Sequence, residues 1–157
     1  MPQSPIRHLR ALSHASLTLT LAATGIHHIF RLGTELIPVT LAAMAVPWLL
    51  LFAYDRFRHW AALVAYAAYA ALIVFWFGIV DGFMDHVLKV LGMENLTLLP
   101  GSEAEVVATV YALWSPAATY WFYEGSGVVS FLLSLAAAGY TVMFLAAAFR
   151  RRPVQAQ

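Results

Sequence analysis

Charged residues divide the chain into long apolar runs. Four stretches without Asp, Glu, Lys or Arg are long enough to cross a bilayer, namely residues 11–30, 36–54, 60–80 and 125–149. A hydrocarbon core about 30 Å thick takes roughly 20 residues of helix. Backbone amides in hydrocarbon must bond within their own segment, and the alternating pattern of a membrane β-barrel is absent from the sequence. The sequence therefore predicts four transmembrane helices, the third extending towards residue 91 with Gly92 as its cap.

A fifth uncharged stretch, residues 106–123, is interrupted at its middle by Ser115-Pro116. Proline lacks a backbone donor and restricts the residue before it, so we expect no fifth span. Ser102 and Glu105 have the spacing of a capping box, which predicts a short helix from Glu103 towards Trp114. The predicted fold is a single all-α domain, a polytopic four-transmembrane-helix bundle, with residues 93–124 forming a short extracytoplasmic cap.

Composition excludes several classes of protein. Of the 157 residues, 62% are hydrophobic and only 11% are charged, against about a quarter in soluble domains, so a soluble enzyme is excluded. The chain has no cysteine, which excludes a disulfide scaffold. No catalytic motif stands out, and the sequence favours a binding or structural role over an enzymatic one.

The basic residues predict the orientation in the membrane. With four spans, seven of the nine fall on one side, at positions 7, 10, 56, 58 and 150–152, and only Arg31 and Lys89 fall on the other. Basic loops remain on the cytoplasmic side, so we expect both termini to be cytoplasmic in an inner (plasma) membrane of bacterial type. This distribution suits lipid head groups and gives no support to nucleic-acid binding.

Polar residues recur at the outer ends of the first and third predicted helices. When the sequence is aligned on His28 and His86, each histidine follows a residue able to bind metal. In both segments a base comes three residues later, and further on a glycine is followed two residues later by a glutamate. This match suggests a two-helix unit repeated in parallel, with the two polar ends meeting on the outer face.

Ionisable residues at the membrane edge are costly unless paired or coordinated, so these residues are candidates for a site. The leading hypothesis is a transition-metal site with His28 and His86 as principal ligands. The remaining positions would come from His27, Asp85, Asp81 and Glu35. Imidazoles with carboxylates suit zinc, copper(II), iron or manganese. At 100° per residue Asp81 and Asp85 share a helix face, whereas His86 is offset from Asp81 by about 140°.

Three alternatives remain open. In a purely structural reading, Arg31 pairs with Glu35 and Asp85 with Lys89, since each pair is four residues apart. A single-haem b-type electron carrier would use His28 and His86 as axial ligands. A non-catalytic accessory subunit would pack through its alanine-rich helices, residues 60–80 and 125–149, against a larger membrane complex or a second copy.

Overall fold

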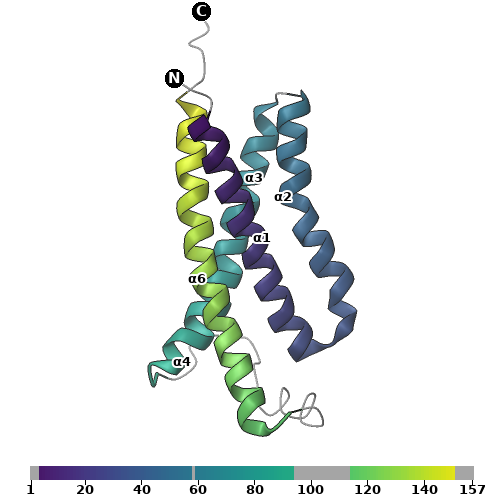
Figure 1. Cartoon of the computed structure of the whole chain (residues 1–157), viewed down its shortest axis with the longest axis vertical. Coiled ribbons are helices and arrows are strands. Elements are labelled where there is room, and N and C mark those ends of the chain that lie inside the picture. Colours follow the sequence, from purple (N-terminus) through teal and green to yellow (C-terminus); the bar gives the residue numbers. More distant parts are fainter. Residues whose placement is uncertain (1–3, 58, 94–113, 151–157) are drawn as a thin grey trace, which may run out of the picture.

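The computed structural model of the chain describes residues 4–57, 59–93 and 114–150, and these residues are almost entirely helical, with no strand among them. Its elements are α1 (Ser4–Leu32), a short 3₁₀ turn η1 (Thr34–Leu36), α2 (Ile37–Phe57), α3 (Trp60–Ile73), η2 (Val74–Val87), α4 (Leu88–Val90) and α6 (Pro116–Phe149). The elements α3, η2 and α4 follow one another without a break and form one long helix, Trp60–Val90 (Figure 1).

The long helices lie roughly alongside one another (Figure 1). The start of α1, the connection from α2 to α3 and the end of α6 lie at one end, which we call the basic end because it carries Arg7, Arg10, Arg56 and Arg150. We call the opposite end the acidic end, since it carries Glu35, Asp81, Asp85 and Glu124. The helix α6 packs against both α1 and η2, so it is the element that connects the first and third long helices.

Three helices in the described part of the chain are long and apolar enough to cross a membrane, namely Thr34–Phe57, Trp60–Val90 and Pro116–Phe149. This composition is that of a membrane protein. The sequence predicts a fourth span in α1, which is long enough but is interrupted by serine, threonine and histidine side chains.

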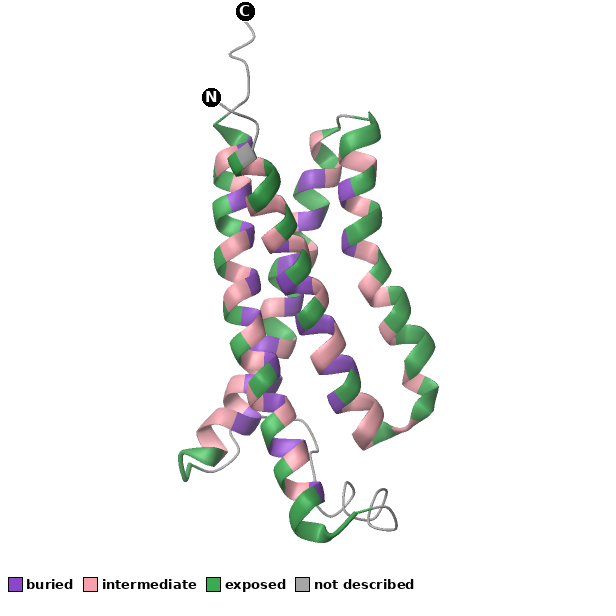
Figure 2. Ribbon diagram, viewed as in Figure 1, coloured by how far each residue is buried: buried purple, intermediate pink, exposed green. Residues whose placement is uncertain are grey.

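The polar side chains of α1 form a buried stripe. Ser13, Ser16, Thr20, Thr24 and His27 recur at three- and four-residue spacing, so they share one face of the helix. Figure 2 shows buried positions recurring along α1 and α6, and Ser13 bonds Thr141 of α6 at 2.8 Å. The sequence predicts packing through alanines and gives no sign of this hydroxyl contact between the two helices.

Part of the third long helix, η2, is a π-helix, whereas the sequence predicts an α-helix there. In η2 the hydrogen bonds join residues five apart, as where Leu88 N–H donates to the Phe83 carbonyl. Residues five apart therefore lie near one another on the same face. The 140° offset predicted between Asp81 and His86 is wrong because it assumes an α-helical period, and both side chains are buried.

The last long helix begins at Pro116, not near residue 125. Ser115 caps it by accepting a hydrogen bond from Ala118 N–H at 3.2 Å, and Pro116 occupies the first turn, where its missing donor costs nothing. Residues 116–124 of the predicted cap thus belong to α6. The rest of that cap, including its predicted helix from Glu103 towards Trp114, falls largely outside the described residues. The predicted Gly92 cap is confirmed, with a φ of 83°.

Close approach of η2 and α6 depends on Gly82. A Cβ atom at this position would lie 2.9 Å from Phe131 Cβ and 3.0 Å from Phe131 N. We expect Gly82→Ala to destabilise the protein by about 1–3 kcal/mol, since overpacking forces backbone to move. Gly139→Ala is the control, because a Cβ there has no neighbour within 4 Å. Thermal unfolding in detergent measures both variants, and equal melting temperatures would contradict this account of the contact.

Candidate metal centre

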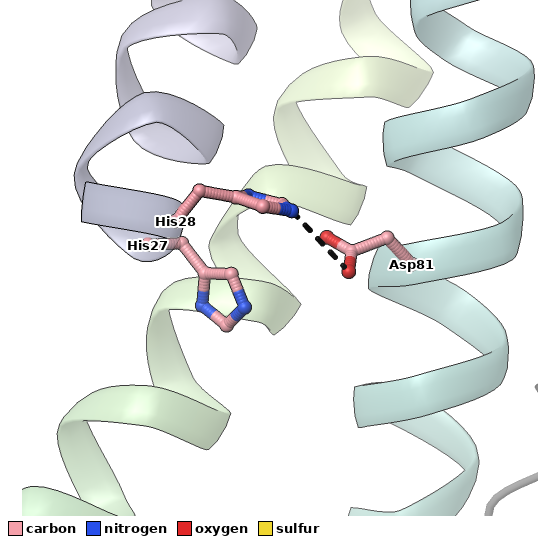
Figure 3. Close-up of side chains that lie close together, drawn as sticks. All are labelled: His27, His28 and Asp81. Carbon is pink, nitrogen blue, oxygen red and sulfur yellow. Dashed lines mark ion pairs between the residues drawn. The ribbon is translucent and has the colours of Figure 1, made fainter. Parts of the chain in front are cut away.

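Three polar side chains from two helices converge at the acidic end. His27 and His28 lie in the last two turns of α1, and Asp81 lies in η2. The three offer ligand atoms that all lie within 4.8 Å of one another (Figure 3). His28 Nε2 and Asp81 Oδ1 are 4.0 Å apart. This group can hold a metal ion.

The hydrogen bond of His28 determines which of its two ring nitrogens carries the proton. His28 Nδ1 lies 3.0 Å from the Thr24 carbonyl, one turn earlier in α1. A carbonyl only accepts, so Nδ1 carries the proton and donates it. In the neutral ring Nε2 then has the free lone pair, and this is the nitrogen directed at Asp81.

His27 is held in the same tautomer by α6. Its Nδ1 lies 2.8 Å from Ser126 Oγ, and that hydroxyl donates its one proton to the Tyr123 carbonyl at 2.9 Å. The imidazole must therefore be the donor to Ser126. Its Nε2 is left as an acceptor, and this atom is buried with no hydrogen-bond partner among the described residues. The His27 ring is also stacked on Tyr123, with ring centres 4.5 Å apart.

His86 completes a set of three imidazoles with the same hydrogen-bond arrangement. Its Nδ1 lies 2.8 Å from Glu124 Oε2, and an ionised carboxylate only accepts. Its Nε2 is again buried and without a hydrogen-bond partner in the described part of the chain. The His86 ring meets the His27 ring edge to face, with centres 4.7 Å apart. His86 therefore lies beside the group formed by His27, His28 and Asp81.

Glu124 orients His86 and also receives Lys89. Each carboxylate oxygen accepts one hydrogen bond. Oε2 accepts from His86, and Oε1 accepts from Lys89 Nζ at 2.6 Å. Glu124 is fully buried, whereas the Lys89 side chain is 25% exposed and lies on the solvent side of the ion pair. A carboxylate that holds the second nitrogen of a histidine is the usual support of a metal-binding imidazole.

A glycine provides the space for His86. A Cβ atom on Gly127 would overlap the imidazole, with its contacts at Cδ2, Cγ and Nε2. The helix α6 can thus approach η2 closely and still leave a pocket for the ring. Sequence reasoning does not assign Glu124, Ser126 or Gly127 to the site. A usable signal exists for one of them, because Glu124 is the only formally charged residue of an otherwise apolar helix.

Asp81 contributes the buried carboxyl group of the set. It is 2% exposed, and its Oδ2 has no hydrogen-bond partner among the described residues. Burying a carboxylate oxygen without a partner is costly, and a cation beside it removes that cost. Asp81 Oδ2 and His27 Nε2, both buried and without a hydrogen-bond partner among the described residues, thus belong to residues of the group that can hold an ion.

The spacing requires only small movements to accept an ion. Zinc–nitrogen and zinc–oxygen bonds of about 2.0–2.2 Å in a tetrahedron place neighbouring ligand atoms about 3.4 Å apart. His28 Nε2 and Asp81 Oδ1, at 4.0 Å, are slightly wider than this. The ligand atoms of the three residues all lie within 4.8 Å of one another, so the side chains must draw together when an ion binds. Nitrogen and oxygen donors of this kind suit zinc, copper(II), iron and manganese.

The remaining predicted ligands lie elsewhere. Asp85 is buried on η2 beside His86 in the sequence, and Glu35 is exposed on η1. Neither belongs to the group of three. The sequence predicts His28 and His86 as principal ligands, whereas the structure places His27 with His28 at Asp81, and His86 against His27. For the haem hypothesis, which pairs His28 with His86, this arrangement supplies no support.

The chain matches no protein-family model, no curated protein and no solved structure. What the site does must therefore follow from its own side chains.

Proposed function

We propose that the chain is a small integral membrane protein that binds a transition-metal ion at His27, His28 and Asp81, with His86 as the fourth ligand. One observation carries this proposal. Each of the three imidazoles donates its Nδ1 proton to a fixed acceptor, which leaves its Nε2 lone pair available, and the Nε2 of His28 lies 4.0 Å from the buried Asp81 carboxylate. Simple helix packing does not require three histidines in the same tautomer.

The electrostatics of the ligand set favour a divalent ion. The Asp81 carboxylate neutralises one charge, and three neutral imidazoles add none. The second carboxylate, Glu124, acts through His86 and is itself balanced by Lys89. The imidazole nitrogens suit Zn²⁺, Mn²⁺, Fe²⁺ or Cu²⁺ rather than Ca²⁺ or Mg²⁺, which prefer all-oxygen ligands. The proposed role is to hold or transfer the ion, without catalysis.

We also propose that α1 crosses the membrane and completes a four-helix bundle. Its hydroxyl stripe faces the interior, while Leu19 and Ile26 are each 55% exposed on the outside. Polar side chains in spans are tolerated where they face the bundle interior. The arginines of the basic end then favour the cytoplasmic side of an inner membrane for both termini, and the metal centre lies at the extracytoplasmic side.

Metal titration of the detergent-purified protein tests the proposal. We expect the wild-type chain to bind one Co²⁺ or Zn²⁺ ion, and Asp81→Asn to bind it about 10- to 100-fold more weakly, because the amide retains the shape but loses the charge. Co²⁺ absorption reports both affinity and coordination geometry.

The matched control is Asp55→Asn at the basic end, which removes the same charge far from the site and should leave affinity unchanged. A wild-type protein that takes up no metal, or equal affinity in both variants, would overturn the assignment.

A further inference from the structure

A cavity of about 450 Å³ lies at the basic end, between α1 and α2. Its polar lining consists of Arg7, Arg10 and His14 from α1 and Asp55 from α2. Trp48 and Phe52 of α2 contribute aromatic surface to the same cavity. Its volume is within the range of sites that take small-molecule ligands, about 300–1,000 Å³. It is separate from the metal centre, which lies at the other end of the helices.

The polar half of the cavity suits an anionic oxygen group. Arg7, Arg10 and His14 are three and four residues apart, so the helical period places them on one face of α1. Arg10 bonds Asp55 at 2.6 Å through one terminal nitrogen, and a guanidinium has five donors in all. Arg7 and Arg10 thus bring two guanidinium groups to this lining, beside the single carboxylate of Asp55. His14 Nε2 is buried and has no hydrogen-bond partner in the described part of the chain.

The apolar half suits hydrocarbon. The rings of Trp48 and Phe52 are stacked at 6.1 Å with an angle of 8° between their planes. They are 59% and 54% exposed, on a helix long and apolar enough to cross a membrane. A small soluble anion would make no favourable contact with these aromatic rings. A ligand that fills both halves has a negatively charged head and an apolar tail.

We propose that this cavity is a binding site for an anionic phospholipid. The phosphate group lies between Arg7 and Arg10, and the first part of an acyl chain lies along Trp48 and Phe52. Basic pockets between spans on the cytoplasmic side are known to suit anionic head groups. The proposal rests on the membrane placement above but is independent of metal binding.

Lipid competition in a nanodisc tests this site. The protein is placed in equal parts of phosphatidylglycerol and phosphatidylcholine, released into detergent, and its retained lipids are measured by native mass spectrometry. We expect the wild-type chain to retain phosphatidylglycerol preferentially. The double variant Arg10→Gln/Asp55→Asn should reduce this preference about fivefold, because it removes the charge-assisted hydrogen bonds from the Arg10 guanidinium to the phosphate.

The double variant leaves the net charge unchanged, so it separates a specific site from general attraction. Arg56→Gln is the counterpart, because it lowers the net charge at the same end but does not line the cavity. We expect Arg56→Gln to retain the lipid preference. An unchanged preference in the double variant, or an equal loss in Arg56→Gln, would overturn the proposal.

Two further measurements complete the test. Inorganic phosphate is added as a competitor, and displacement of the lipid at equal concentration would assign the cavity to a soluble phosphate instead. Zinc affinity of the double variant is measured in parallel and should equal that of the wild type, which shows that the chain remains folded. Failure of the lipid site and failure of the metal site are thereby distinguished.

Discussion

Glu124→Ala is expected to destabilise the protein by about 3 kcal/mol. Removing one partner of a buried ion pair leaves an uncompensated charge, which costs about 3–5 kcal/mol. Glu124 of α6 is fully buried and bonds both His86 and Lys89 of the long helix Trp60–Val90. The lower end of the range applies because the Lys89 side chain is 25% exposed and can turn towards water. Unfolding in detergent with a chemical denaturant measures the loss.

Two variants make this prediction specific to the carboxylate. Glu124→Gln keeps the shape and one carbonyl acceptor, so it should cost about 1–2 kcal/mol, less than alanine. Glu35→Ala removes an exposed glutamate from the same end and should change stability by less than about 0.5 kcal/mol. If Glu124→Ala were as stable as Glu35→Ala, the hydrogen bonds to His86 and Lys89 would have no energetic weight.

Much of the helical pattern could be predicted from the sequence because it depends on local properties. Long uncharged runs indicate helices, and a helix ends where Gly92 supplies a positive φ. The effect of Pro116 is harder to predict, since a proline can either interrupt a helix or occupy its first turn. Here it occupies the first turn, after the Ser115 cap. The role of α1 also depends on its surroundings, because Ser13 finds its hydrogen-bond partners on other helices, at Tyr66 and Thr141.

The site could be predicted by residue type but not by geometry. The sequence shows that His27, His28, Asp81 and His86 are unusual at the membrane edge. It gives no sign of the π-helix, which brings residues five apart together and so places Asp81 and His86 on one face. The hydrogen bonds that fix the imidazoles come partly from α6, a hundred residues away in the case of His27 and Ser126, and no local pattern reveals such a contact.

The double variant His27→Ala/His28→Ala is expected to lower metal affinity by about 10³- to 10⁴-fold. Structural zinc sites bind with about 10–16 kcal/mol through four ligands, which is about 3 kcal/mol for each, and every 1.4 kcal/mol is a factor of ten. Loss of two ligands therefore lowers the metal affinity by about four orders of magnitude. Water molecules that take the vacant positions make the loss somewhat smaller. Elemental analysis of the purified protein and zinc competition with a chelator measure the change.

The control removes two histidines that lie outside the site. His8 and His59 are exposed near the basic end, so His8→Ala/His59→Ala should bind metal as the wild type does. His28 is partly exposed and its one hydrogen bond is to a backbone carbonyl, so the single variant His28→Ala should remain folded and should also bind metal more weakly. If both double variants retained equal affinity, the ion would have to be bound elsewhere. The three matched tautomers at the acidic end would then be a feature of helix packing alone.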